Sequence, residues 1–327
     1  MIHLRVVSPP DVTGTLMPVL RTDPAVLNLT MFPGAVSNPD GDAVHFDVLH
    51  GAANDVIGQL RNLGLEERGS IVLENVDTSI SARADRAMVR TGKFQQFTPV
   101  WAEVEARIGL EGSFPPSWFV LLVIAGLIGA VGILINSEIL IVGAMVVGPE
   151  YGAILSLAFG VMRHDWTRAR RSVAALVIGF TLAVVAALLL SLIIRWAGLE
   201  PRLYRLGFRP VSDLINTPNW FSFIVAALAG IVGVVSLTES RTSTLIGVFI
   251  SVTTIPAASD IGVSLAFGSD KEAWGSALQL VLNVAVLTIV AIAGLPLQGA
   301  IWRRAARRAP GRFPAGGGNA AKRARQR

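Results

Sequence analysis

The sequence predicts an α-helical multi-pass membrane protein with about six spans and an N-terminal α+β domain of ferredoxin-like fold. Three observations lead to this fold class. First, the 327-residue chain is 52% hydrophobic and only 16% charged, whereas about 25% of the residues of a soluble domain are charged. Second, residues 1–115 mix charged and apolar positions, while residues 116–302 contain long uncharged runs. Third, the pattern of those runs recurs about a hundred residues later.

Residues 1–80 contain six short elements in the order β-α-β-β-α-β, which is the order of a ferredoxin-like fold. Alternating apolar residues predict strands at 2–6, 27–31 and 44–48, and the run SIVLENV predicts a fourth strand at 70–76. Helical spacing predicts a helix capped by Asp11 and a second helix that stops at Gly64. The fold includes the ACT regulatory domains, which bind small ligands, but a structural or oligomerising role is the alternative. Neither the glycines nor the histidines have the spacing of a phosphate or metal site, so no cofactor or metal is expected.

Two flanking segments have simpler predicted roles. Residues 81–115 are a basic linker followed by an amphipathic elbow helix that begins at Thr98 and Pro99. This helix lies on the membrane or against the helical bundle, or it packs on the N-terminal domain. Residues 303–327 form a basic tail that is expected to be disordered. Its arginines fix the topology or hold anionic lipid headgroups.

Six segments between residues 116 and 302 have the roughly 20 mainly apolar residues that a membrane-spanning helix needs. They are Ser117–Ile135, Ile139–Met162, Ser172–Ile194, Trp220–Leu237, Thr244–Phe267 and Ala277–Trp302. Six of the seven tryptophans lie at the ends of these segments, where an aromatic belt meets the lipid headgroups. They are Trp118, Trp166, Trp196, Trp220, Trp274 and Trp302.

The distribution of arginine predicts that both termini are cytoplasmic. The connection RHDWTRARR and the tail after the sixth span are both strongly basic, and basic loops stay inside. The loop between the third and fourth spans is an exception, because it carries four arginines: Arg195, Arg202, Arg205 and Arg209. A signal peptide is not expected from the N-terminal sequence MIHLRVVSPP, because no basic region followed by a long apolar core is found there.

The two halves of the span region repeat each other. The sequence AGLIGAV at Ala125 matches AGIVGVV at Ala229, an offset of 104 residues. Further on, SLAFG recurs with an offset of 108, from Ser156 to Ser264, and a tryptophan follows each copy at the same distance. Each repeat, 117–196 and 220–302, therefore holds three spans. An odd number of spans inverts the second repeat, which is the architecture of many secondary transporters.

The middle span of each repeat is interrupted by proline, in VVGPEYGAI and in SVTTIPAASDIG. Proline removes a backbone donor, so both helices should kink or unwind, and such half-helices build substrate or ion sites. Glu150 and Asp260 are the acidic residues well inside a span, where a charge costs about 3 kcal/mol or more. The predicted site for a cation, proton or other small solute comprises Glu150, Asp260, Pro149, Tyr151, Thr254, Pro256, Ser259 and Asn283.

Purely structural roles for the same residues are the alternatives. Glu150 could cap the N-terminus of a half-helix, or both acids could be protonated hydrogen-bond donors. The breaks could also be re-entrant turns that place the acids near the surface. Hydrogen bonding between helices suffices to explain Asn283.

The segment LIVGAMVVGPEYGAILSLAFG resembles the bacterial family of uncharacterised hydrophobic proteins that carry domain of unknown function 389. The matching residues are Gly143, Ala144, Met145, Pro149, Gly152 and Gly160, after a short NSE connection. The resemblance covers roughly residues 100–300. It implies a multi-pass protein of the bacterial inner (plasma) membrane, sometimes with an extra N-terminal domain, and it carries no activity that transfers to this chain.

The sequence thus favours a transporter or channel for a small solute or ion over two other functions. The alternative is a membrane-anchored sensor or scaffold whose N-terminal domain binds a metabolite or partner. An enzyme is not expected: apart from a conceivable acid–base pair of Glu150 and Asp260, there is no Ser–His pair, HExxH motif or Walker loop. The expected partners are the lipid bilayer, the solute and possible further copies of the chain. Nucleic acid is not expected, because the arginines flank apolar runs.

Overall fold

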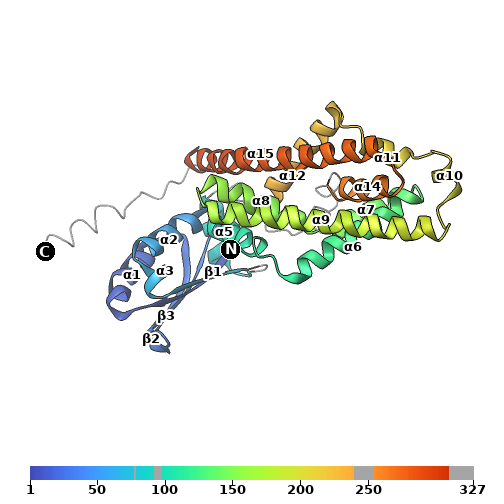
Figure 1. Ribbon diagram of the computed structural model, residues 1–327. Coiled ribbons are helices and arrows are strands. Elements are labelled where there is room, and N and C mark those ends of the chain that lie inside the picture. The colour runs from blue at the N-terminus through green and yellow to red at the C-terminus, as the bar shows by residue number, and fades with distance from the viewer. Residues whose placement is uncertain (77–78, 92–97, 239–253, 309–327) are drawn as a thin grey trace. The chain divides into compact units, whose positions relative to one another are not determined.

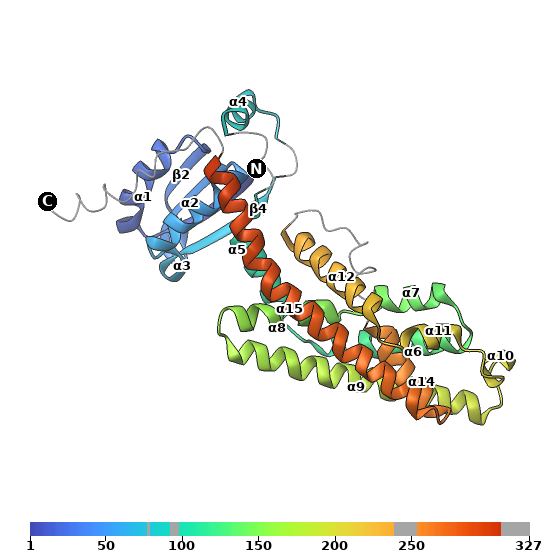
Figure 2. The same ribbon diagram turned by 90° about the horizontal axis from the view of Figure 1, so that it is seen from above.

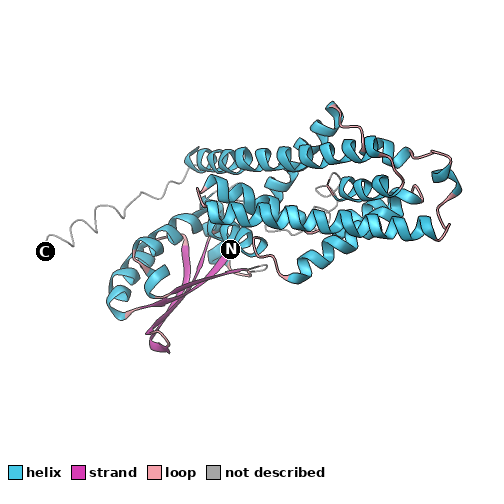
Figure 3. Cartoon of the chain, in the orientation of Figure 1, coloured by secondary structure: helices cyan, strands magenta, loops and turns pink. Residues whose placement is uncertain are grey.

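A computed structural model describes residues 1–76, 79–91, 98–238 and 254–308 of the chain (Figure 1). It divides into two compact units, Met1–Val104 with Gly299–Arg327, and Glu105–Gln298. The first unit contains a four-stranded sheet, whereas the second contains only helices among the residues described there (Figure 3).

The first unit has the predicted order of strands and helices, with two short additional helices. Its elements are β1 (Ile2–Ser8), α1 (Pro10–Thr22), β2 (Val26–Ser37), β3 (Asp40–Val48), α2 (His50–Asn62), α3 (Leu65–Arg68), β4 (Ser70–Asn75) and α4 (Ala82–Thr91). The sheet order is β2-β3-β1-β4, and every neighbouring pair is antiparallel. This arrangement agrees with the β-α-β-β-α-β pattern expected from the sequence.

Alternation along the strands creates the core of this unit. Ile2, Leu4 and Val6 of β1 are buried on one face and pack with apolar residues of α1 and α2, as the period of two predicts. The expected cap at Asp11 is wrong. Pro9 is the N-cap of α1 and makes no side-chain cap, and the Asp11 carboxylate instead binds Arg68 at 2.8 Å.

The predicted elbow is helix α5 (Trp101–Glu111), which begins two residues after Pro99, the expected first helical residue. Pro99 precedes it, and its carbonyl oxygen accepts a hydrogen bond of 2.8 Å from Asn54. Residues 101–104 belong to the first unit and residues 105–111 to the second. Part of the linker before α5, residues 92–97, lies outside the described residues.

Nine further helices begin among the described residues of the second unit, and the last of them continues into residues 299–308 of the first unit. They are α6 (Pro116–Leu134), α7 (Glu138–Val147), α8 (Glu150–Met162), α9 (Trp166–Trp196), α10 (Arg202–Arg205), α11 (Pro210–Ile215), α12 (Trp220–Thr238), α14 (Ile255–Ala266) and α15 (Asp270–Arg308). Among the described residues, α6, α9 and α15 are long and apolar enough to cross a membrane. The bent pair α7–α8 makes a fourth such segment if it is one span.

The six predicted spans are therefore found in part. The predicted fourth span corresponds to α12, a shorter apolar helix. The predicted fifth span, Thr244–Phe267, begins outside the described residues, and its described end forms α14. Six spans remain a prediction.

Helix boundaries recur along the second unit with an offset of 104 residues. The ranges of α6 and α12 differ by 104 at both ends, as do the last residues of α8 and α14. The turn that follows is the same in both places. His164 and Gly268 have φ of 59° and 73°, and the next amides bond back to Gly160 and Ser264 over 2.8 and 2.9 Å. Figures 1 and 2 show by their colours that α9 and α15 then run in opposite directions.

The SLAFG copies do not occupy equivalent places within this pattern. The first copy begins at Ser156 inside α8, whereas the second begins at Ser264 and crosses the end of α14. Trp166 is the first residue of α9, whereas Trp274 is the fifth of α15. These helix ends thus recur with an offset of 104 residues. The predicted change to an offset of 108 residues applies only to the sequence SLAFG and the tryptophan that follows it.

Four of the six tryptophans predicted for the belt are exposed, whereas Trp302 is half-buried and Trp118 is buried. Trp166, Trp196, Trp220 and Trp274 are between 58% and 91% exposed. Trp118 is only 7% exposed, and its indole Nε1 donates to the carbonyl oxygen of Pro149 at 3.2 Å. Trp118, predicted to anchor the chain at the membrane interface, instead donates a hydrogen bond to the break between α7 and α8.

Candidate functional site

The first predicted helix break is present between α7 and α8. The two helices are bent by 50° at a break formed by Gly148 and Pro149. Proline cannot donate to the preceding turn, so a new helix begins after it. Glu150 is the first residue of that helix, where the dipole of the helix favours a carboxylate.

Glu150 forms a hydrogen bond to the other broken helix. Its Oε1 accepts a bond of 2.5 Å from the hydroxyl of Thr254, the N-cap residue of α14. Glu150 and Thr254 are 1% and 0% exposed, so this contact is in the interior. The N-termini of α8 and α14 therefore meet at one carboxylate.

The two partners of this bond are 104 residues apart, the same separation as the recurring helix ends. A two-fold axis exchanges a residue with its equivalent in the other half. A contact between two such equivalent residues is therefore exchanged with itself, which is possible only where the contact lies on the axis. The Glu150–Thr254 bond is thus where an axis relating the two halves would pass.

Asp260 occupies a second buried polar cluster. It is 0% exposed, and each carboxylate oxygen accepts a serine hydroxyl, Ser212 of α11 at 2.7 Å and Ser276 of α15 at 2.6 Å. Asn216 extends the cluster with a bond of 3.4 Å to Ser212. Thr254 and Asp260 are six residues apart on one helix, which is about 9 Å along its axis. The acids share no hydrogen-bond partner among these contacts, so they sit in two adjacent clusters.

The other predicted residues surround these clusters. Ser259 donates to the carbonyl oxygen of Gly126 on α6 at 3.1 Å. The Tyr151 ring packs against Gly233 of α12, and Pro256 is buried in the first turn of α14. Asn283 of α15 is buried and accepts a bond of 3.1 Å from Gln279.

Sequence reasoning missed the polar partners of Asp260. Ser212 lies in a connection between predicted spans, and serine carries no periodic pattern there. Ser276 had a weak signal: with Gln279 and Asn283 it follows the i, i+3, i+7 spacing of one helical face. All three are less than 10% exposed, so α15 presents a polar stripe to the interior.

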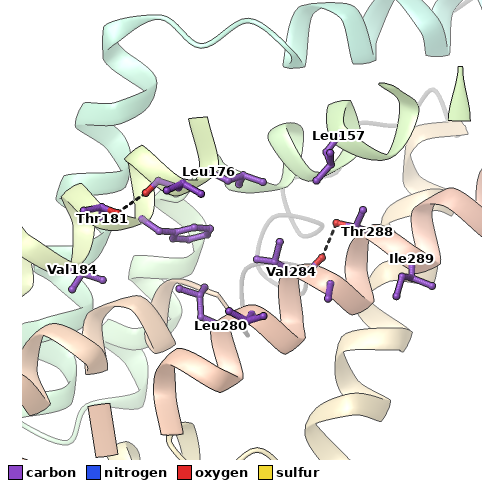
Figure 4. A pocket seen from close by; sticks show the side chains of 12 residues that line it. Leu157, Leu176, Thr181, Val184, Leu280, Val284, Thr288 and Ile289 are labelled. Atoms are coloured by element: carbon purple, nitrogen blue, oxygen red, sulfur yellow. Dashed lines mark hydrogen bonds between the residues drawn. The ribbon is translucent and has the colours of Figure 1, made fainter. Parts of the chain in front are cut away.

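The second unit also contains a large groove that is apolar. It has a volume of about 610 Å³ and lies between α8, α9 and α15 (Figure 4). The lining residues are Leu157, Leu176, Val177, Phe180, Thr181, Val184, Leu280, Val281, Val284, Ala285, Thr288 and Ile289. Its two hydroxyls, of Thr181 and Thr288, each bond to a carbonyl oxygen of their own helix. Neither Glu150 nor Asp260 lines this groove, so it is separate from the polar clusters.

In its described residues, the second unit is therefore a helical bundle with three or four helices that could cross a membrane, and with buried acids at its broken helices. Residues 145–289 match the family model described as "Domain of unknown function (DUF389)". This match confirms the resemblance predicted from the sequence, over a narrower range than the 100–300 expected. Both acids, Ser212, Ser276 and Asn283 lie within it.

A relative among curated proteins is "Uncharacterized protein MJ0678" of Methanocaldococcus jannaschii. It is 19% identical over 172 residues, which are 53% of this chain and 51% of that protein. The chain thus spans about half the length of this relative. No solved structure matches the chain.

Proposed function

We propose that the protein is a transporter or channel of the inner (plasma) membrane for a small solute or ion, with its site between the two broken helices. The observation that carries the proposal is the buried Glu150–Thr254 bond of 2.5 Å, which joins the N-termini of α8 and α14. The proposal assigns the acids to a pathway and not to an enzymatic reaction. It includes six spans and cytoplasmic termini, and it allows assembly with further copies of the chain.

An inverted repeat is the architecture that we propose for the second unit. It is supported by the 104-residue recurrence of helix ends and by the opposite directions of α9 and α15 (Figure 2). Three spans in each half invert one half relative to the other. Transporters built in this way place their sites at discontinuous helices where the repeats meet.

The chemistry of the two clusters supports a pathway for an ion or a small polar solute. Burying a carboxylate in a membrane costs several kcal/mol unless partners compensate. The chain provides hydroxyl partners for both Glu150 and Asp260, all from serine or threonine. A hydroxyl can donate a hydrogen bond to a carboxylate, and its oxygen can coordinate a cation or accept a hydrogen bond from a protonated group, so these partners permit the charge of the site to change during a cycle.

The test is flux in proteoliposomes containing a trapped pH-sensitive or cation-sensitive dye, with an imposed proton or potassium gradient. Glu150→Gln and Asp260→Asn keep volume and hydrogen-bonding capacity while removing the charge. We expect each to reduce flux at an unchanged yield of folded protein. Glu138→Gln is the matched control, because this acid is exposed on the same unit, and it should leave flux unchanged. Undiminished flux in the variant lacking both buried acids would refute the proposal.

A membrane-anchored sensor or scaffold is the second candidate function, and the folded sheet unit of residues 1–104 favours it. In that case the first unit binds a metabolite or partner and the helices serve as an anchor. Neutralising Glu150 and Asp260 would then leave ligand or partner binding intact, and no flux would be found in the parent protein.

A further inference from the structure

Two short helical segments cover the broken helices at equivalent positions. Residues 105–111, the second part of α5, precede α6, and α11 precedes α12. Residues 106–111 and the range of α11 are again separated by 104. Each segment thus belongs to one half of the proposed repeat.

Each cover lies against a buried polar side chain of one broken helix. After α5, a β-carbon on Gly112 would lie 2.5 Å from the hydroxyl of Ser156 in α8, and the side chain of Glu111 packs on Gly152. In the other half, Ser212 of α11 donates to Asp260 of α14. Ser156 and Asp260 are again 104 residues apart, so the two covers lie over equivalent sites.

Each of the two covering segments, residues 105–111 and α11, is also held in place by an ion pair at its start. Glu105 pairs with Arg163 at the end of α8. Arg209, at the position equivalent to Glu105, pairs with Glu272 at 2.9 Å and donates to Ser269 at 2.8 Å. Arg168, at the position equivalent to Glu272, lies with Arg163 over the Phe159 ring, at 5.4 and 5.3 Å. Glu105 and Arg209 thus occupy equivalent positions with opposite charge, as do Arg168 and Glu272, while the partner of Glu105 is Arg163, five residues before Arg168.

The two ion pairs lie at opposite ends of the second unit. Figures 1 and 2 both place the turn between α8 and α9 at one end and α10 and α11 at the other. The side chains in these pairs are between 15% and 58% exposed. Partly exposed ion pairs contribute little stability and break readily, as a closure that opens during each cycle requires.

We propose that α5 and α11 are the two gates of the pathway, with Glu105–Arg163 and Arg209–Glu272 as the latches that hold them closed. This inference rests on the proposed transport function and deepens it. Opening the α5 gate exposes Ser156, and opening the α11 gate exposes the Asp260 cluster from the opposite end. With one latch closed while the other opens, the interior is reached from one side at a time.

The test uses the absence of cysteine from the natural sequence. Single cysteines replace Ser156 and Ser276, which lie under the α5 and α11 covers. Their rates of modification by an impermeant methanethiosulfonate are measured from each face of proteoliposomes containing the full chain. Glu105→Gln and Glu272→Gln open the latches with little change of shape. Glu200→Gln is the matched control, because it breaks the 2.9 Å pair with Arg205 in the same loop as α11.

We expect Glu272→Gln to speed modification at position 276 from one face by roughly 2- to 10-fold and to leave position 156 unchanged. Glu105→Gln should do the converse from the other face, and Glu200→Gln should change neither rate. Exchanging the charges, as in Arg209→Glu with Glu272→Arg, should restore slow modification. That rescue also excludes misfolding as the cause of faster labelling.

Two results would overturn the gates. One is an unchanged rate in both latch variants, and the other is modification of both reporters from the same face. Flux is measured in parallel so that the two proposals fail separately. Latch-dependent accessibility without any flux upholds the gates and removes transport, whereas flux with latch-independent accessibility removes the gates alone.

Discussion

The bond between Glu150 and Thr254 should couple the two halves of the helical unit measurably. Thr254→Val removes the hydroxyl at nearly constant volume and leaves a buried carboxylate oxygen without this donor. A hydrogen bond to a charged group contributes about 1.5–3 kcal/mol, and this buried bond of 2.5 Å belongs to that class if Glu150 is ionised, as the proposed ion pathway requires. We expect Thr254→Val to lower the free energy of unfolding by about 2 kcal/mol.

A double-mutant cycle isolates the pairwise contribution. Glutamine at position 150 still accepts a bond from Thr254, but a neutral one, which contributes about 1 kcal/mol. Thr254→Val should therefore cost about 1 kcal/mol less in the Glu150→Gln background than in the parent. The assay is equilibrium urea unfolding in detergent micelles, followed by tryptophan fluorescence.

The matched control is Thr181→Val, because that hydroxyl bonds only to the carbonyl oxygen of Val177 on its own exposed helix face. We expect its effect to stay within about 0.5 kcal/mol. A cost below about 0.5 kcal/mol for Thr254→Val in both backgrounds would refute the reasoning. The Glu150–Thr254 bond would then contribute little to holding the two halves together.

Three other predictions concern the rest of the chain. Burial lowers the pKa of His50, so protonation of this side chain favours unfolding. The stability of the full chain should therefore fall as the pH drops below about 6.5. His50→Gln should reduce that loss of stability, measured in thermal unfolding scans. A β-carbon on Gly262 would lie 2.6 Å from a carbonyl oxygen of α9, so Gly262→Ala should cost about 1–3 kcal/mol. Gly143→Ala meets nothing within 4 Å and should be neutral or stabilising in the same unfolding assay. Cysteines at Gly92 and Gly317 should resist an impermeant thiol reagent in intact cells, and ready labelling of either would contradict cytoplasmic termini.

Periodic features of the fold were predictable from the sequence because each follows from one local pattern. Alternation placed three of the four strands, and proline marked the break before Glu150. The depth of Glu150 and Asp260 followed from the apolar runs around them. Which partners these acids find was not predictable, because Ser212 and Ser276 come from segments whose approach depends on the tertiary packing of α11 and α15.

The two offsets of the repeat show how a sequence match can hide a structural one. The pentapeptide recurs at 108 and the helix ends at 104, a difference of four residues. Four residues are about one helical turn, so a shift of that size keeps each side chain on the same face. A pentapeptide shifted by one turn can therefore place its side chains on the same helix face, while the ends of the helices keep the offset of 104 residues. Helix boundaries are visible only in the structure, so the sequence alone could not separate the two.

The arginines that conflict with the positive-inside rule have structural roles at their own end of the protein. Arg195 donates to the carbonyl oxygen of Ala266 at 2.5 Å, and Arg209 binds Glu272. The rule describes how loops partition during insertion, and it does not account for side chains that hold helix ends together afterwards. If Arg209 is a latch, a positive charge must remain in this loop whatever the orientation. Its presence there therefore carries less weight against cytoplasmic termini than the basic connection between α8 and α9, where Arg170 and Arg171 are exposed.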